Sequence, residues 1–153
     1  MSIISSIMLN NKADEEIERL TNLKKGAINT FAERNVHLMM MNLLMPNDEY
    51  LKEKRNLITE YHKNLFKFLD TKIEFWKYVK LGKFPKNFID TLNETMNDWL
   101  LSGWEYIGMK NHREDAKGAK DEFEFFKTII NSCGVIQDKK KPTRRGGKNK
   151  KKN

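Results

Sequence analysis

Residues 48–82, DEYLKEKRNLITEYHKNLFKFLDTKIEFWKYVKLG, decide the fold class of this chain. The helix is expected to open at Asn47-Asp48 and to run to Leu81, and Gly82 is a typical stop after its last turn. Between the ends of this segment, apolar side chains recur at spacings of three and four, with two gaps of seven where Lys54 and Lys72 interrupt the stripe, which is the pattern of one helical face. The residues of this face are Leu51, Ile58, Tyr61, Leu65, Phe68, Phe75 and Val79.

This helix is unusually long for the size of the chain. At 1.5 Å per residue it would extend about 50 Å, which exceeds the diameter of a compact domain of this length. It therefore either breaks near Asp70 and Thr71 or projects to meet a partner. We expect the unbroken form.

Three further segments show helical spacing. The first runs from about Ala13 to Leu44, where Gly26 allows a kink. The next spans Asn87 to Leu101, and we expect Ser102-Gly103 to interrupt it. The last runs from about Ala116 to Cys133. Because no stretch alternates with period two, no sheet is expected. The sequence thus predicts an all-α helical bundle of about four segments with one long helix.

The charge is divided very unevenly between a helical body, residues 1–137, and a tail, residues 138–153. The body holds 20 basic and 20 acidic residues. The tail has one acid, Asp138, and nine cations, so it carries the whole net charge of +8. Those cations are Lys139, Lys140, Lys141, Arg144, Arg145, Lys148, Lys150, Lys151 and Lys152.

The tail contains no apolar residue, so it cannot bury surface to offset the entropy of ordering, and we expect it to be disordered. A flexible arm with nine cations is suited to a phosphate backbone. It holds no aromatic ring to stack on bases, so we expect binding of nucleic acid, or of another polyanion, without sequence specificity. Other interpretations remain open: an acidic protein surface, a nuclear-localisation signal at Lys139-Lys140-Lys141-Pro142, an anionic membrane surface or a solubilising tail.

Two apolar groups in the body are candidates for binding a protein partner. Met40 and Met41 belong to a Met-rich run that resembles an adaptable surface, and Trp99 and Trp104 are of the kind that anchor interfaces. For both groups, packing in the chain's own core is the preferred interpretation. Together with the long helix, however, they exceed what a small monomer readily buries, which favours a subunit of a larger assembly, with a homo-oligomer among the options.

We find no constellation of residues that indicates catalysis. His37, His62 and His112 lie in different segments without further ligands at metal-binding spacing. Cys133 is expected at a helix end, whereas a catalytic thiolate prefers a helix N-terminus or cationic neighbours. No phosphate-binding or dinucleotide-binding glycine motif is present. We therefore expect neither catalytic residues, nor a bound metal, nor a cofactor.

The single cysteine excludes an internal disulfide and favours a reducing intracellular compartment: cytoplasm, nucleus or a virus particle. The N-terminal segment lacks the features of a signal peptide. No apolar run approaches the twenty or so residues needed to span a bilayer. We therefore expect no membrane span.

Three functional hypotheses remain. The first is a non-enzymatic structural or assembly protein, as in a virus particle or a ribonucleoprotein, whose body packs on protein neighbours and whose tail binds nucleic acid. The second is an independent nucleic-acid-binding or adaptor protein with a nuclear-localisation type of tail, and the third is a small enzyme of unrecognised type. The neutral body favours the first, because a folded face that coats nucleic acid should itself be basic.

Overall fold

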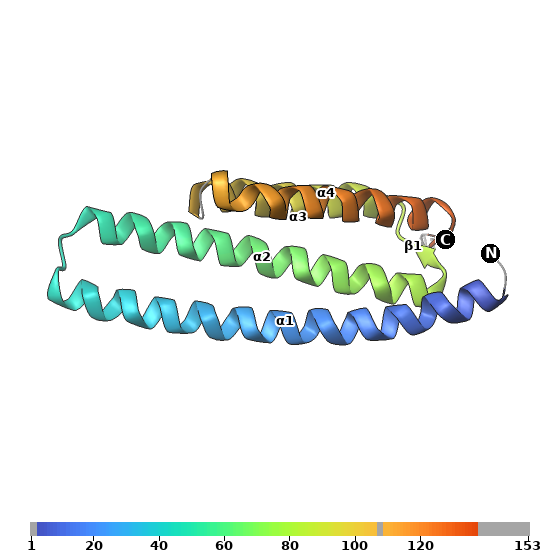
Figure 1. Cartoon of the computed structure of the whole chain (residues 1–153), viewed down its shortest axis with the longest axis horizontal. Coiled ribbons are helices and arrows are strands. Elements are labelled where there is room, and N and C mark those ends of the chain that lie inside the picture. The colour runs from blue at the N-terminus through green and yellow to red at the C-terminus, as the bar shows by residue number, and fades with distance from the viewer. Residues whose placement is uncertain (1–2, 107–108, 138–153) are drawn as a thin grey trace, which may run out of the picture.

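The computed structural model describes residues 3–106 and 109–137, and helices make up nearly all of this part of the chain (Figure 1). The helices are α1 (Ile3–Leu44), α2 (Glu49–Leu81), α3 (Phe88–Tyr106) and α4 (Met109–Asn131). The two short strands are β1 (Lys83–Phe84) and β2 (Gly134–Val135). The predicted all-α bundle of about four segments is confirmed. The predicted disordered tail, residues 138–153, lies outside the described residues.

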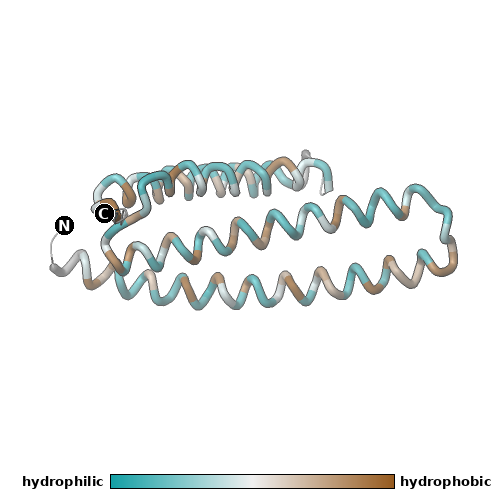
Figure 2. Tube along the Cα trace, turned by 180° about the vertical axis from the view of Figure 1, so that it is seen from behind, coloured by the Kyte–Doolittle hydropathy of each residue, from teal (hydrophilic) through white to brown (hydrophobic). Residues whose placement is uncertain are grey.

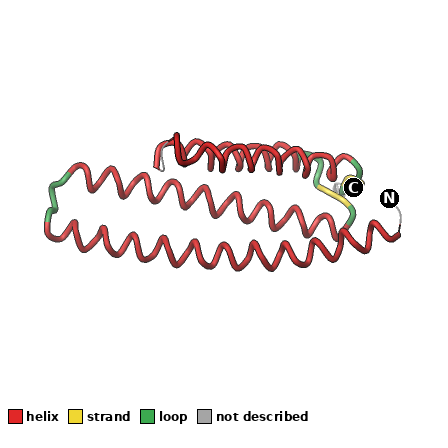
Figure 3. The backbone as a smooth tube through the Cα atoms, in the orientation of Figure 1, coloured by secondary structure: helices red, strands yellow, loops and turns green. Residues whose placement is uncertain are grey.

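Successive helices run antiparallel, and α2 lies between α1 and the pair formed by α3 and α4 (Figure 1). With 42 and 33 residues, α1 and α2 are about 63 and 50 Å long at 1.5 Å per residue. The other two helices have only 19 and 23 residues. The α3–α4 pair therefore covers only the part of the α1–α2 hairpin next to the connection from α2 to α3, and the loop joining α1 to α2 lies at the uncovered end (Figure 3).

The main core forms where all four helices meet. Phe75 and Trp76 of α2 are 0% and 1% exposed. Phe75 stacks on Phe126 of α4 with ring centroids 3.9 Å apart, and Trp76 meets the same ring edge-on at 5.7 Å. Ala13 and Leu20 join this core from α1. Each large side chain buried here contributes roughly 1.5–3 kcal/mol, so α2 is held firmly from both sides.

The predicted bounds of α2 and its unbroken course are confirmed. Asp48 caps the N-terminus, where its Oδ1 accepts a hydrogen bond from the Leu51 N–H at 3.2 Å. Gly82 ends the helix with a φ of 77°, a conformation that favours glycine. The helix passes through Thr71, whose hydroxyl donates to the Lys67 carbonyl oxygen at 2.8 Å instead of disturbing the backbone.

The first helix begins at Ile3, not near Ala13 as predicted. Leu9 and Ala13 pack against the main core, so the extra turns are held by tertiary contacts that spacing alone does not reveal. The helix also continues through Gly26, where a side chain would meet no neighbouring atom within 4 Å. The possible kink there is therefore not needed.

The predicted interruption at Ser102-Gly103 is wrong, and so is the predicted start of the last helix near Ala116. Helix α3 continues to Tyr106 and α4 begins at Met109. His112, in the early part of α4, is fully buried and lies directly against Gly103. Glycine is present at this position because the imidazole ring occupies the space of a side chain, not because the helix ends.

A minimal parallel sheet corrects the expectation of no strands. Lys83 pairs with Gly134 and Phe84 with Val135. The Ile136 N–H donates to the Phe84 carbonyl oxygen at 2.8 Å. Two residues per strand are too few to show alternation in the sequence. The sheet fixes the end of the described chain, and thus the base of the tail, beside the connection from α2 to α3.

Replacing Gly103 with alanine should destabilise the fold. A methyl group there would overlap the His112 ring, and such overpacking typically costs about 1–3 kcal/mol. Gly118→Ala is the matched control, because it also lies within a helix but meets no atom within 4 Å. We expect this control to gain up to about 1 kcal/mol from helix propensity. Urea unfolding measures the free energy of unfolding of both variants. A Gly103→Ala chain as stable as the unmodified chain would contradict the close packing of α3 on α4.

Candidate functional site

The four-helix part of the molecule ends at Tyr106, the last residue of α3. The Arg34 guanidinium of α1 donates to the Tyr106 hydroxyl at 2.8 Å, and the rings of Tyr61 and Tyr106 lie 5.1 Å apart. Beyond this point α1 and α2 continue as a pair with a small core of their own. That second core consists of Leu38, Leu51 and Ile58, with Phe31, Met41 and Tyr106 packed against it.

Six large apolar side chains at the end of the hairpin are exposed. We call them the apolar tip: Val36, Met39, Met40, Leu43, Leu44 and Met45. Leu43 and Leu44 are 83% and 82% exposed, and hydrophobic positions continue to the end of α1 in Figure 2. This segment is apolar around most of its circumference, yet only α2 is present to cover it. A contiguous apolar patch of this kind is typical of an interaction site.

The apolar tip is hollowed rather than flat. A groove of about 310 Å³ is lined by Val36, Met39, Met40, Asn42, Leu43 and Arg55. Arg55 comes from α2, so the groove spans both helices of the hairpin. A side chain from a partner would find methionine and leucine walls here, which adapt easily to different shapes.

The structure corrects the preferred interpretation of the methionine run. Met39 and Met40 are exposed and Met41 is half-buried against the second core, whereas burial of the run in the chain's own core was expected. The reason is that α3 and α4 do not reach the end of the hairpin where α1 and α2 are joined. Partner binding by Met40 and Met41 stays a prediction.

The two tryptophans lie apart from the methionines, in the main core. Trp99 is half-buried and stacks on Phe68 with ring centroids 5.3 Å apart. Trp104 is also half-buried and meets the His112 ring edge-on at 5.5 Å. The structure therefore brings both tryptophans into the contact between α2, α3 and α4. It does not group them with Met40 and Met41 in a single patch.

The nine predicted polyanion-binding residues, Lys139 to Lys152, lie outside the described residues. What the structure provides is the position of the tail's base. Gly134 and Val135 pair with β1 at the four-helix end, far from the end of α1 that carries the apolar tip (Figure 1). The described chain therefore ends at the opposite end of the molecule from the apolar tip.

Two of the three histidines are buried. The Nδ1 atom of His62 lies 3.0 Å from the Ile58 carbonyl oxygen, and burial lowers the pKa of this imidazole. His112 is packed between the Trp99 and Trp104 rings, with an Asp115 oxygen 3.6 Å from its Nδ1 atom. Within residues 3–106 and 109–137, no group of three or more His, Cys, Asp or Glu side chains is arranged to hold a metal ion.

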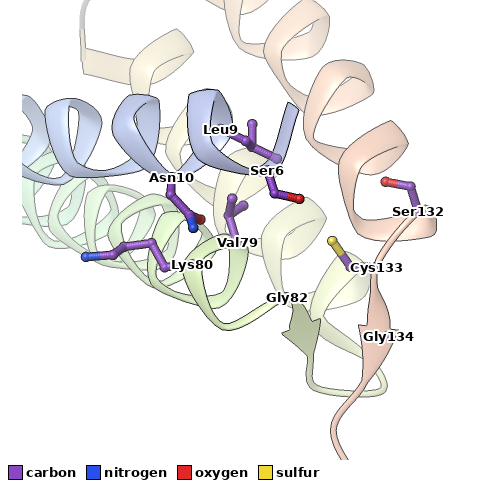
Figure 4. A pocket seen from close by; sticks show the side chains of 9 residues that line it. All are labelled: Ser6, Leu9, Asn10, Val79, Lys80, Gly82, Ser132, Cys133 and Gly134. Atoms are coloured by element: carbon purple, nitrogen blue, oxygen red, sulfur yellow. The ribbon is translucent and has the colours of Figure 1, made fainter. Parts of the chain in front are cut away.

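A pocket of about 250 Å³ surrounds Cys133 at the four-helix end (Figure 4). Burial raises the pKa of the Cys133 thiol, which disfavours the thiolate needed for nucleophilic chemistry. Lys80 lines the same pocket, but its ammonium pairs with Asp14 at 2.5 Å. The other polar groups lining the pocket are Ser6, Asn10 and Ser132. This set lacks the base that would activate a serine or cysteine.

A hollow of about 500 Å³ lies between α1 and α2 near Gly26 and Ala27. Arg34 and His62 supply polar atoms there. Both already have partners within the chain, because Arg34 donates to the Tyr106 hydroxyl and His62 contacts the Ile58 carbonyl oxygen. No pattern in the sequence predicted this hollow, which is lined by two small residues at adjacent positions of α1, Gly26 and Ala27.

None of the described helices combines the length and the apolarity required to cross a membrane. Comparison with models of protein families, with curated proteins and with solved structures finds no significant match to this chain. The functional conclusions below therefore depend on the chemistry of the chain itself.

The free energy of unfolding should decrease as the pH falls from 7.5 to 5.5. Because burial lowers the pKa of His62 below its ordinary value of 6.5, the unfolded chain takes up this proton first. The contribution of neutral His62 to the free energy of unfolding is complete above about pH 6.5. It is lost as the pH falls toward the pKa of this imidazole in the folded chain. Urea unfolding at several pH values measures the slope.

His62→Gln should reduce this slope, whereas His37→Gln at an exposed position of α1 should keep it. An unchanged slope in the His62→Gln chain would show that this imidazole is not the group responsible.

Proposed function

We propose that this protein is a non-enzymatic structural or assembly protein. Its helical body packs on protein neighbours through the apolar tip, and its basic tail binds nucleic acid or another polyanion without reading sequence. The main support is the separation of these two properties along the chain, since the body is electrically neutral and the tail carries +8.

Opposite charges are mixed on the surface of the described body. Lys24 pairs with Asp70 at 2.7 Å, and Lys72 of α2 pairs with Glu122 of α4 at 3.1 Å. A shallow hollow between α2 and α3 contains two lysines and three acids: Lys63, Lys67, Glu60, Asp98 and Glu105. A helical face that bound phosphates would need cations without such neighbours. This pattern favours the tail as the polyanion-binding element.

The geometry allows both contacts to form at once. The tail begins at the four-helix end, while the apolar tip lies at the opposite end of the hairpin (Figure 1). Sixteen residues can extend at most roughly 55 Å at about 3.3–3.6 Å per residue. The tail can therefore reach a polyanion at a distance from the body while the tip remains docked on a neighbour.

The apolar tip supports a protein neighbour rather than a small ligand. Its groove is open and bounded by flexible methionine and leucine side chains, with Arg55 and Asn42 as its polar members. Apolar centres with a few polar groups at the margin are typical of protein interfaces. In an assembly, the area that is exposed in the single chain would become buried.

Removing the tail's charge should abolish most polyanion binding. We compare the full chain with a variant in which the nine tail cations are replaced by glutamine. For duplex DNA, nine phosphate contacts predict a slope of log K against log salt of about −8. Two duplexes of unrelated sequence should bind equally well, because the tail has no means of reading base edges. Fluorescence anisotropy at several salt concentrations gives these values.

A matched body variant replaces four exposed lysines, Lys63, Lys67, Lys77 and Lys86, with glutamine. It should retain most of the affinity and a steep salt dependence. Equal losses in the body and tail variants would contradict a tail-based mechanism, as would salt-independent binding by the full chain.

A further inference from the structure

Residues 25–43 of α1 present a stripe of exposed side chains on the side of the helix opposite Leu38, and three of them line the groove that Arg55 of α2 also borders. Leu38 faces inward in the second core. Val36 lies two residues earlier, and at 3.6 residues per turn this corresponds to a rotation of about 200°. The outward positions recur at alternating spacings of four and three, the pattern of a coiled-coil seam. They are Lys25, Asn29, Ala32, Val36, Met39 and Leu43, all exposed.

The seam is complementary to itself when two copies run antiparallel. If Leu43 of one copy lies opposite Ala32 of the other, the largest apolar residue of the seam meets the smallest. In the same register Val36 lies opposite Met39. The arrangement repeats on both sides of a twofold axis, as an isologous interface requires. Between Asn29 and Leu43 the seam contains no charged side chain, so no like charges meet.

The charges at the ends of the seam are also complementary. In this register Lys25 of one copy lies just beyond the end of the other copy's α1. That region holds the loop and the first turn of α2, where Asp48 and Glu49 are found. The Glu49 carboxylate pairs with Lys52 of its own helix at 3.2 Å, but its side chain is 84% exposed, so a cation from a second copy can share it. Lys25 is likewise exposed.

We infer that a second copy of this chain covers the apolar tip, and that two chains pair antiparallel along residues 25–43 of α1. This inference rests on the function proposed above and names the protein neighbour in it. Leu44, Met45 and Tyr50, which are exposed at the tip, extend the contact at both ends of the seam.

One helix pair buries less than the roughly 800 Å² per partner of a standard interface. We therefore expect a reversible dimer with a Kd on the order of micromolar.

Antiparallel pairing would place the two tails far apart. The base of the tail is level with the start of α1, because Ser6, Leu9 and Gly134 line one pocket (Figure 4). From there to the twofold axis near residue 37 is about 30 helical residues, so the two bases would lie about 90 Å apart at 1.5 Å per residue. Such a dimer would hold a polyanion at two distant points and bind it more tightly than one tail does.

Sedimentation velocity over a range of micromolar concentrations tests the pairing. The full chain should shift from 18.1 kDa toward twice that mass. Val36→Glu combined with Leu43→Glu should raise the dimer Kd at least tenfold, because it places carboxylates in the seam. Leu101→Glu is the matched control, since Leu101 is 63% exposed on α3, and it should dimerise like the unmodified chain. A full chain that stays monomeric, or a control that loses dimerisation equally, overturns the inference.

Disulfide trapping tests the direction of pairing. In a chain carrying Cys133→Ser, the combination Ala32→Cys and Leu43→Cys should form a covalent dimer on mild oxidation. Either substitution alone should not, because each position faces the other one across the interface. Efficient cross-linking of the Ala32→Cys chain by itself would indicate parallel pairing and overturn the antiparallel arrangement.

The same samples separate failure of the dimer from failure of the proposed function. A monomeric full chain with tail-dependent, salt-sensitive DNA binding would overturn the second copy as the neighbour and leave the polyanion-binding tail in place. Dimerisation with DNA binding that is unaffected by neutralising the tail would support the seam and contradict the tail mechanism.

Discussion

Burial of α2 from two sides is the constraint on which the rest of the structure depends. This helix packs against each of the other three. Its Phe75 ring stacks on Phe126 of α4, its Phe68 ring stacks on Trp99 of α3, and Lys24 and Asp14 of α1 pair with its flank. Because α1 and the α3–α4 pair are attached to the same central helix, the length of each partner decides how far α2 is covered.

The unequal lengths of the helices explain where the exposed surface lies. The α3–α4 pair ends at the contact of Arg34 with Tyr106, and past this contact the hairpin relies on a small core around Leu38 and Ile58. An α1 segment that is apolar on most sides then has a covered inner face and an uncovered outer one. The exposed leucines and methionines are thus a consequence of architecture.

The sequence predicted those features that depend on local signals. Asn47-Asp48 and Gly82 marked the ends of α2 because capping and left-handed backbone are local properties, and the structure has Asp48 as the cap. Prediction from the sequence failed where a residue distant in the chain decides the local structure. Gly103 was interpreted as a helix break, although His112 is what requires glycine there. The exposure of Met40 could not be foreseen, because it depends on how far α3 and α4 reach. Strands of two residues are too short to leave a pattern.

Amide hydrogen exchange along α2, on a sample dilute enough to be monomeric, tests the two-sided burial most directly. Residues 66–79 lie in the main core, where α1 packs on one side and α3 and α4 on the other, whereas residues 49–57 contribute only to the second core, which α1 and Tyr106 of α3 complete. The structure predicts that amides of the first segment exchange only through global unfolding, and that those of the second exchange faster through local opening. Equal protection along the whole of α2, or slower exchange at 49–57, would contradict this account.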